Sequence, residues 1–262
     1  MTKIAIIGLG HVGKGLRDRL DGVCDLVTYD IADGRDYPAD DLATCDLGFI
    51  CVGTPSAPDG SADVSHVIDA VNAAQFSPIV IKSTVPPGTT DRLIAETGKT
   101  ICFSPEYTGE SHWVGSTWQQ FEDAAAFQIV GGEPAARRAV LDVLVSLFGP
   151  ETQMFQCTAA EAEMVKYAEN TYFATKVTFV NEIARLCAAA GLDWHTVREG
   201  WLLDPRVERD HTAVFPDAPG FAGRCLPKDL DALIAFAQNE LGTTAGLLEA
   251  VRQRNETFIA GR

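Results

Sequence analysis

The sequence predicts an α/β protein, with a doubly wound, largely parallel sheet in residues 1–155 and an all-helical domain with one long central helix in residues 156–262. Three observations lead to this prediction. Apolar, β-branched runs alternate with helical stretches in the first half, a glycine-rich turn follows the first run, and a long helical pattern without internal Gly or Pro begins the second half. Such alternation is typical of a parallel sheet covered by helices on both faces.

Composition limits the classes of function. The 262 residues are 46% hydrophobic, so the chain can bury a sizeable core. A formal net charge of −15 argues against nucleic acid and anionic membranes as general partners. No apolar run approaches the roughly 20 residues of a membrane span, and the N-terminus shows no signal-peptide architecture. The seven scattered cysteines form no CxxC pair or His/Cys cluster, which predicts no metal site and favours a reducing cytoplasm.

The first apolar run ends in a glycine-rich turn with GxGxxG spacing, formed by Gly8, Gly10 and Gly13 around His11 and Val12. The first glycine permits a tight turn, and the second lets the backbone approach a pyrophosphate. The third allows the following helix to pack closely on the strand, with its positive dipole end toward the phosphates. The turn therefore predicts a Rossmann-type dinucleotide site.

The second strand-like run ends in Asp30, twenty residues after Gly10. A carboxylate at this place can accept hydrogen bonds from the adenosine ribose hydroxyls and would repel a 2′-phosphate. The pattern therefore favours NAD over NADP. A strand, turn and helix without any ligand is the alternative, and the paired acid makes it less favoured.

Further strands are expected in four segments: 46–55, 77–90, 100–111 and 125–132. Loops at the carboxyl ends of parallel strands line the ligand crevice. The side chains and backbone expected around one cleft on this basis are Gly53, Thr54, Pro55, Ser83, Thr84 and Glu106. For Thr84 and Glu106 a turn hydroxyl and a solvated surface acid are equally good interpretations.

A long helix is expected from a capping-box signature at Thr158 and Glu161 to Ala190, with Gly191 just beyond its end. At ~1.5 Å per residue it would be about 45 Å long, which suits a domain connector and a dimer core.

One stripe of this helix mixes polar and apolar residues. Lys166 and Asn170 are four residues apart, so they share a face, and Asn181 falls near the same stripe. Solvated surface is the ordinary interpretation of such residues. Because Phe173 and Val177 lie on the stripe as well, a lysine that lines a cleft is also possible, and such lysines tend to be functional.

Cys225 has surroundings that favour a nucleophilic thiolate. It follows a glycine-bearing turn and precedes Pro227, which suits the first position of a helix. The positive end of the helix dipole and the flanking cations Arg224 and Lys228 favour the thiolate, and Asp229 is close enough in sequence to orient the thiol or exchange protons with it. The alternative is a buried, inert cysteine.

Seven motifs occur in order along essentially the whole chain: IAIIGLGHVG, ICVGTP, KSTVPPGT, SPEYTGES, EMVKYAENTYFATKVTFVNE, DPRV and GFAGRCLPKD. Together they resemble the UDP-glucose/GDP-mannose dehydrogenase family, whose members oxidise the C6 alcohol of a nucleotide sugar to a carboxylate with NAD. The SPEY-x-x-E form resembles the UDP-glucose and GDP-mannose branches more than the N-acetylated-sugar branch.

The resemblance implies a role for each residue of the predicted site. Cys225 would capture the aldehyde of the first oxidation as a thiohemiacetal, which a second oxidation converts to a thioester. Lys166 would stabilise oxyanion charge, Asn170 would position the sugar or the oxyanion, and Asp229 would assist proton movement.

Further roles follow from the same resemblance. Thr84 and Glu106 would hold the catalytic water and act as base, and Glu110 would be a further acid. Arg206 would reach the sugar site of a neighbouring subunit, which implies a functional homodimer. Substrate would also contact two glycines of the cysteine loop, Gly220 and Gly223.

The chain departs from the family pattern in three places. Ala222 replaces the first of two glycines that usually precede the cysteine, and an arginine usual before the second glutamate is absent near Thr108 and Gly109. Family members also continue into a C-terminal nucleotide-binding domain, whereas this sequence stops at Arg262.

Three hypotheses remain from the sequence. The leading one is an NAD-dependent nucleotide-sugar 6-dehydrogenase that converts UDP-glucose to UDP-glucuronate and dimerises through the long helix. The second is a dehydrogenase of a smaller hydroxylated or sugar substrate. The third is a non-catalytic NAD-binding homologue, which the joint presence of the predicted catalytic residues disfavours.

Overall fold

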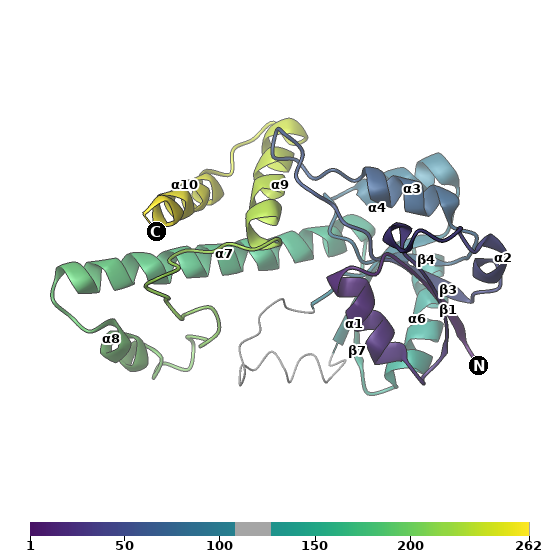
Figure 1. The fold of residues 1–262 in the computed structure, drawn as a ribbon, viewed down its shortest axis with the longest axis horizontal. Coiled ribbons are helices and arrows are strands. Elements are labelled where there is room, and N and C mark those ends of the chain that lie inside the picture. Colours follow the sequence, from purple (N-terminus) through teal and green to yellow (C-terminus); the bar gives the residue numbers. More distant parts are fainter. Residues whose placement is uncertain (108–126, 262) are drawn as a thin grey trace. The chain divides into compact units, whose positions relative to one another are not determined.

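The computed structural model describes residues 1–107 and 127–261 (Figure 1). They form two compact units. Unit 1 comprises Met1–Pro55 and Ala62–Lys166, and unit 2 comprises Ser56–Ser61 and Tyr167–Arg262. The division falls inside the long helix α7, Ala159–Ala189. The boundary expected from sequence, at residues 155/156, lies inside the strand β7, Gln153–Cys157, which precedes this helix.

Unit 1 contains a seven-stranded sheet with the order β2-β1-β3-β4-β5-β6-β7. All neighbouring strands are parallel except β5 and β6, which pair antiparallel at Phe103 and Gly131. The predicted largely parallel, doubly wound sheet is confirmed. Its strands are β1 Lys3–Ile7, β2 Asp25–Tyr29, β3 Leu47–Ile50, β4 Ile79–Ile81, β5 Ile101–Phe103, β6 Phe127–Gly131 and β7 Gln153–Cys157.

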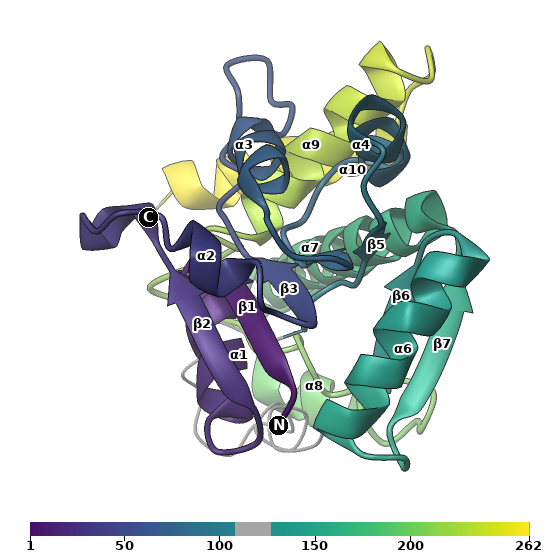
Figure 2. The ribbon, with the colours of Figure 1, turned by 90° about the vertical axis from the view of Figure 1, so that its right-hand side faces the viewer.

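Helices cover both faces of this sheet (Figure 2). One face packs against α2, α3 and α4, and the other packs against α1 and α6. Among the described residues of unit 1, the helical elements before α7 are α1 His11–Leu20, η1 Ile31–Asp33, α2 Ala39–Leu42, α3 Ser65–Ala73, α4 Thr89–Thr97 and α6 Pro134–Phe148.

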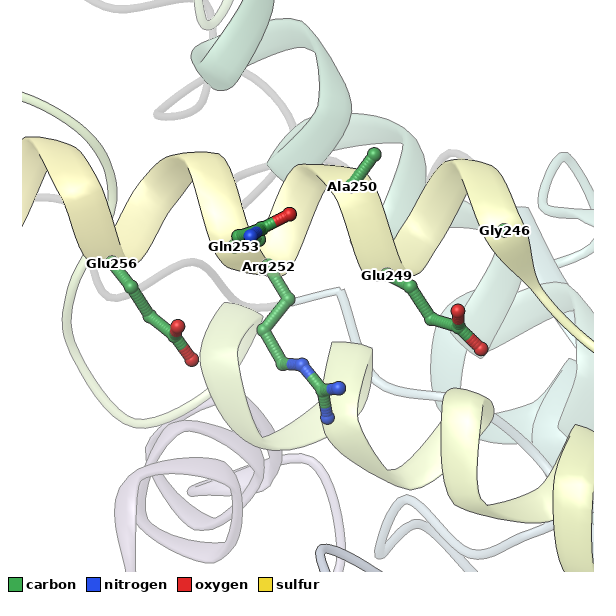
Figure 3. A pocket seen from close by; sticks show the side chains of 6 residues that line it. All are labelled: Gly246, Glu249, Ala250, Arg252, Gln253 and Glu256. Carbon is green, nitrogen blue, oxygen red and sulfur yellow. The ribbon is translucent and has the colours of Figure 1, made fainter.

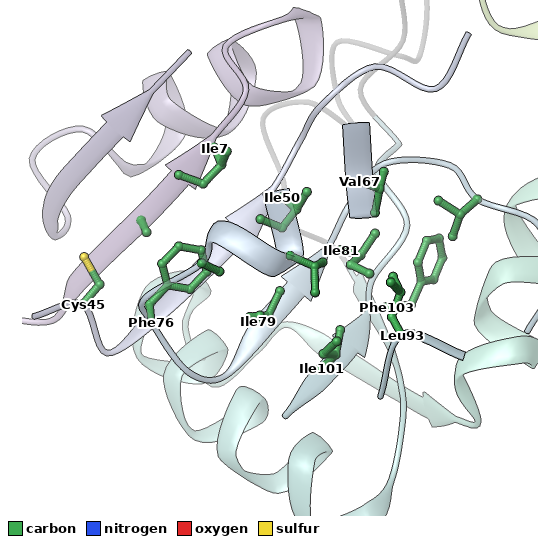
Figure 4. Packing of buried hydrophobic residues seen from close by; sticks show 14 of the residues in the cluster. Ile7, Cys45, Ile50, Val67, Phe76, Ile79, Ile81, Leu93, Ile101 and Phe103 are labelled. Carbon is green, nitrogen blue, oxygen red and sulfur yellow. The ribbon is translucent and has the colours of Figure 1, made fainter. Parts of the chain in front are cut away.

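The two covered faces explain why the central strands are apolar throughout. In β1, Ala5 and Ile7 enter one core while Ile4 and Ile6 enter the other, because successive side chains of a strand point to opposite faces. Figure 4 shows the first core, in which strand side chains meet Phe76 and those of α3 and α4.

Strand β7 is absent from the sequence-based prediction. It pairs in parallel with β6 over its full length, from Gln153 to Cys157, at the edge of the sheet. Because one of its sides is open, residues such as Phe155, which is 53% exposed, do not form the continuous apolar run that marks the central strands.

The predicted long helix is confirmed as α7. Its capping box forms as expected, since the Glu161 carboxylate accepts from the Thr158 backbone N–H at 2.8 Å and the Thr158 hydroxyl accepts from the Glu161 N–H at 3.3 Å. Gly191 follows its end with a φ of +69°, a left-handed conformation that favours glycine.

A buried carboxylate of α7 caps another helix of unit 1. Glu163 is fully buried, and its two oxygens accept from the backbone N–H groups of Gly88 at 2.6 Å and Thr90 at 2.8 Å at the start of α4. The Thr90 hydroxyl donates to it as well, at 2.6 Å. Burial nevertheless raises the pKa of Glu163 from 4.5 to about 7, against the opposing effect of these hydrogen bonds.

This raised pKa predicts a pH-dependent stability. The folded state binds the Glu163 proton more tightly than the unfolded chain, so its contribution is largest below about pH 4.5 and is lost as the pH rises to about 7. The unfolding free energy of the wild type relative to Glu163→Gln should fall across this window by up to about 3 kcal/mol, measured by urea denaturation. Glu161→Gln is the control, since the pKa of Glu161 is lowered and its effect lies at more acidic pH. A flat difference for Glu163→Gln would contradict the prediction.

Unit 2 packs short helices against the second part of α7. They are α8 Trp194–Trp201, α9 Leu226–Asn239 and α10 Gly246–Ala260. Ala174 of α7, Leu230 and Ile234 of α9 and Val251 of α10 form its core around Phe221. Residues 202–219 contain no helix or strand. Within residues 1–107 and 127–261, no helix combines the length and the apolar character that a membrane span needs.

Candidate functional site

The glycine-rich turn between β1 and α1 has the backbone geometry that its spacing predicts. Gly8 has a φ of +91°, and a Cβ on it would lie 2.8 Å from the backbone of Cys51. A Cβ on Gly13 would lie 1.8 Å from the carbonyl oxygen of Gly8. Gly10, the N-cap of α1, has nothing within 4 Å of its Cβ position, so the backbone at this helix N-terminus is open to an anionic group.

Asp30 follows β2 directly and is tied to this turn. Its Oδ2 accepts from the Leu9 N–H at 2.5 Å, and its Oδ1 accepts from the Ala32 N–H at 2.8 Å. Each carboxylate oxygen can accept a further hydrogen bond, so ribose hydroxyls can bind beside these contacts. The open Gly10 backbone and the fixed Asp30 carboxylate fit the pyrophosphate and the adenosine ribose of NAD.

The loops after β3 and β4 are joined by side-chain hydrogen bonds. The Thr54 hydroxyl donates to the Thr84 carbonyl at 2.9 Å, and the Ser83 hydroxyl donates to the Val52 carbonyl at 2.7 Å. Gly53, between them, has open space at its Cβ position. Predicted residues thus gather at the carboxyl ends of adjacent strands. Thr54 and Ser83 are buried there and hold the two loops together.

Glu106 lies after β5 with a partner that the sequence-based prediction does not include. Its Oε1 accepts from the Tyr107 N–H at 2.9 Å, and its Oε2 lies 3.5 Å from Nζ of Lys82. Lys166 reaches the same segment, with its Nζ 4.9 Å from the centroid of the Tyr107 ring. The structure therefore brings Glu106 and Lys166 to one segment of unit 1. Glu110, with Thr108 and Gly109, lies outside the described residues.

In unit 2, Cys225 is the N-cap residue of α9 and is exposed. Its carbonyl accepts from the Asp229 N–H at 2.9 Å, the first bond of the helix. The helix begins at Leu226, one residue earlier than expected. Pro227 is tolerated in its first turn, because a backbone N–H at that position would have no partner within the helix. The thiol therefore lies at the positive end of the α9 dipole, as predicted.

The other six cysteines, all in the described part of the chain, are buried or half-buried. Burial raises the pKa of the Cys51 and Cys102 thiols to about 12. Cys225 thus differs from them in both place and exposure.

Asp229, in the first turn of α9, is 1% exposed and bonded on both sides. Its Oδ2 accepts from Nδ2 of Asn170 at 2.5 Å, and its Oδ1 pairs with Nζ of Lys228. The structure therefore joins two predicted residues, Asn170 and Asp229. The Lys228 cation is engaged by Asp229, so it is not simply a flanking charge for the thiol.

Two buried amides hold the loop that leads to Cys225. Asn181 accepts from the Gly220 N–H at 3.1 Å, and Asn255 accepts from the Phe221 N–H at 2.8 Å and donates to its carbonyl at 2.9 Å. Gly220 has a φ of +78°, and a Cβ there would lie 2.4 Å from Oδ1 of Asn255. The conformation of the loop therefore requires glycine at position 220, independently of the predicted contact with substrate. Gly223 is also left-handed, with a φ of +93°.

Removal of the second amide should loosen the cysteine loop. Asn255→Leu would leave the buried N–H and carbonyl of Phe221 without these partners, which should lower the unfolding free energy by about 2–4 kcal/mol. Urea denaturation would measure the change. Gln253→Leu is the matched control because Gln253 is an exposed amide of the same helix. Equal losses in both variants would contradict the anchoring role.

Arg206 and Ala222 of unit 2 are exposed, as are Gly223 and Cys225. Arg206 has 88% of its side chain exposed and pairs with Asp204 at 2.6 Å. Ala222, which departs from the family pattern, is also exposed.

A groove lies along one face of α10 (Figure 3). Its lining residues are Gly246, Glu249, Ala250, Arg252, Gln253 and Glu256, which include none of the predicted site residues. Among the residues that the structure describes, no group of three or more His, Cys, Asp or Glu side chains could hold a metal ion.

Two stretches of the chain match models of one protein family. Residues 34–121 match the NAD binding domain of the UDP-glucose/GDP-mannose dehydrogenase family, and residues 160–257 match its central domain. The chain belongs to this family of NAD-binding dehydrogenases.

Individual relatives are named UDP-glucose 6-dehydrogenase. The chain is 36% identical to the UDP-glucose 6-dehydrogenase of Rhizobium meliloti, over 83% of this chain and 53% of the relative. It is 34% identical to that of Pseudomonas aeruginosa, over 92% and 53%. A solved UDP-glucose dehydrogenase from Pyrobaculum islandicum is 29% identical with a TM-score of 0.83, over 98% of this chain and 68% of that one. The chain spans about half the length of the curated relatives it matches.

Proposed function

We propose that this chain catalyses the NAD-dependent oxidation of the C6 alcohol of a nucleotide sugar to a carboxylate, with UDP-glucose as the favoured substrate. One observation carries the proposal: an exposed cysteine occupies the N-cap position of α9, one turn before the buried Asp229–Asn170 pair. A thiol so placed suits capture of an aldehyde, which distinguishes alcohol-to-acid oxidation from simple alcohol oxidation. The 36% identical relative named UDP-glucose 6-dehydrogenase supports the choice of sugar.

In this proposal the cysteine is covalently bound to the substrate between the two oxidations. NAD, held by the glycine turn and Asp30, supplies the hydride acceptor for each oxidation. The alcohol first loses a proton and a hydride to become an aldehyde, and the Cys225 thiolate adds to its carbonyl carbon. Loss of a second hydride from this adduct leaves a thioester. Water then cleaves the C–S bond, which releases the carboxylate and restores the thiol.

The remaining residues stabilise charge and move protons. Lys166 and Asn170 would bind the oxygen that becomes negative when the thiolate or water adds to the carbonyl. Glu106 would accept protons from the alcohol and the water, with Thr84 orienting that water. Asp229 would shuttle a proton near the thiol, and Arg206 would bind the substrate of a neighbouring subunit.

A substrate panel tests the function. The protein is incubated with NAD and, separately, UDP-glucose, GDP-mannose and glucose, with NADH followed by absorbance and the product identified by mass spectrometry. We expect UDP-glucose to give UDP-glucuronate and two NADH for each acid formed. If no nucleotide sugar gives NADH, or if NADH forms without an acid, the proposal is wrong.

We also propose that two copies associate through α7. Tyr172, Phe179 and Leu186 recur every seven residues on this helix and are 53%, 50% and 58% exposed. Such a stripe on a long helix is typical of a helix–helix interface.

Disruption of this stripe should change the oligomeric state. Phe179→Glu should convert a dimer to a monomer in size-exclusion chromatography with light scattering, because it would bury a charge in the interface. Ala188→Glu places the same charge at an exposed position on the opposite side of α7 and should leave the dimer intact. A monomeric wild type, or an unchanged dimer in Phe179→Glu, would rule out this interface.

A further inference from the structure

Lys82 is a buried cation just after β4, and none of the roles proposed above uses it. Its side chain is 2% exposed. Its Nζ lies 3.5 Å from Oε2 of Glu106, donates to Oγ of Ser104 at 3.3 Å and lies 5.9 Å from the centroid of the Phe49 ring. Removal of an ammonium group from water is costly unless it is paired and hydrogen-bonded, and both conditions are met here.

Glu106 itself is only 14% exposed. Burial disfavours an ionised carboxylate, while a nearby cation and an N–H donor favour it. The donor is the Tyr107 N–H at 2.9 Å, and Lys166 lies over the ring of the same tyrosine. The Cys51 thiol is close enough to both Lys82 and Glu106 for their charges to affect it, but burial raises its pKa to about 12, so it stays neutral. Lys82 therefore supplies a buried positive charge directly beside the carboxylate.

We propose that Lys82 is a positioning residue that keeps Glu106 ionised and fixes the direction of its carboxylate. Lys82 holds Oε2 and the Tyr107 N–H holds Oε1, so the carboxylate is fixed from two sides while it is ready to accept a proton. The inference rests on the proposed function, because the role of Glu106 as proton acceptor belongs to it. The competing explanation, that Lys82 only fills space beside Phe49, assigns no effect to its charge.

A titration that does not depend on turnover tests the inference. The ionisation of Glu106 is followed by NMR of protein with ¹³C-labelled glutamate carboxyl groups, and its signal is assigned by its loss in Glu106→Gln. In Lys82→Met, which keeps most of the length of the side chain but not the charge, the midpoint should rise by at least about one pH unit. Lys82→Arg should restore the midpoint toward that of the wild type. Lys82→Gln is a second neutral variant for use if Lys82→Met does not fold.

A matched lysine controls for general loss of charge. Lys99 donates to three backbone carbonyls at the opposite end of β5, so Lys99→Met should leave the Glu106 midpoint unchanged. An unchanged midpoint in the neutral Lys82 variants, or the same rise in Lys99→Met, overturns the inference.

Kinetics separate this inference from the proposed function. If both hold, Lys82→Met lowers kcat for UDP-glucose at neutral pH with little change in KM, and the acid limb of its pH profile moves up with the NMR midpoint. A midpoint that moves while the pH profile does not supports the hold of Lys82 on Glu106 but contradicts Glu106 as the proton acceptor. Loss of kcat without movement of the midpoint contradicts the inference and leaves the proposed function standing.

Discussion

Cys225→Ser is expected to abolish acid formation and to leave NAD binding unchanged. The N-terminus of α9, where Cys225 is the N-cap residue, favours a thiolate nucleophile, whereas a serine hydroxyl is far less acidic and adds poorly to an aldehyde. We expect acid formation to fall by ~10³-fold or more, the scale seen when a covalent nucleophile is removed. NADH and acid are measured together, so a residual first oxidation would appear as NADH without acid.

A loss of folding stability in Cys225→Ser should not account for the loss of acid formation. Serine is a better helix N-cap than most residues, so the variant should be at least as stable as the wild type. Cys157→Ser is the control, because Cys157 is a half-buried thiol of β7 whose pKa is raised by burial. Acid formation that survives in Cys225→Ser, or that is lost equally in Cys157→Ser, would exclude Cys225 as the nucleophile.

Local patterns predicted most of the fold because each has a short-range physical cause. The glycine turn needs positive φ at Gly8 and close approach at Gly13, and both are visible in the residue spacing alone. The capping box at Thr158 and the glycine after α7 are likewise complete within a few residues of sequence. Central strands are apolar because both faces are buried, whereas the edge strand β7 lacks this pattern and was missed.

The parts of the site that were missed depend on contacts between residues distant in sequence. Asn255 bonds to Phe221, which is 34 positions earlier, and no local pattern joins the two. Lys82 ends an apolar strand run and begins the motif KSTVPPGT, but its contact with Glu106 depends on the pairing of β4 with β5. The residue types therefore indicate the chemistry of the site, whereas the contacts that hold these residues in place can be identified only from the folded structure.

Gly13→Ala should destroy NAD binding through the shape of the glycine turn. The new Cβ would lie 1.8 Å from the carbonyl oxygen of Gly8, and because this neighbour is backbone, the turn or α1 must move. We expect a loss of about 3 kcal/mol or more in unfolding free energy, at the upper end of the cost of overpacking, and NAD binding too weak to detect by calorimetry.

Gly10→Ala separates loss of the ligand site from loss of the turn. A Cβ at Gly10 meets nothing within 4 Å, and its φ of −68° suits alanine, so unfolding free energy should change by less than about 1 kcal/mol. The methyl group would nevertheless occupy the open space at the α1 N-terminus where the pyrophosphate is expected, so NAD affinity should fall at least about tenfold. Unchanged NAD affinity in Gly10→Ala would mean that the cofactor phosphates lie elsewhere, even if Gly13→Ala unfolds as expected. Weak binding in both variants with lost stability only in Gly13→Ala is the pattern that a pyrophosphate seated on this turn requires.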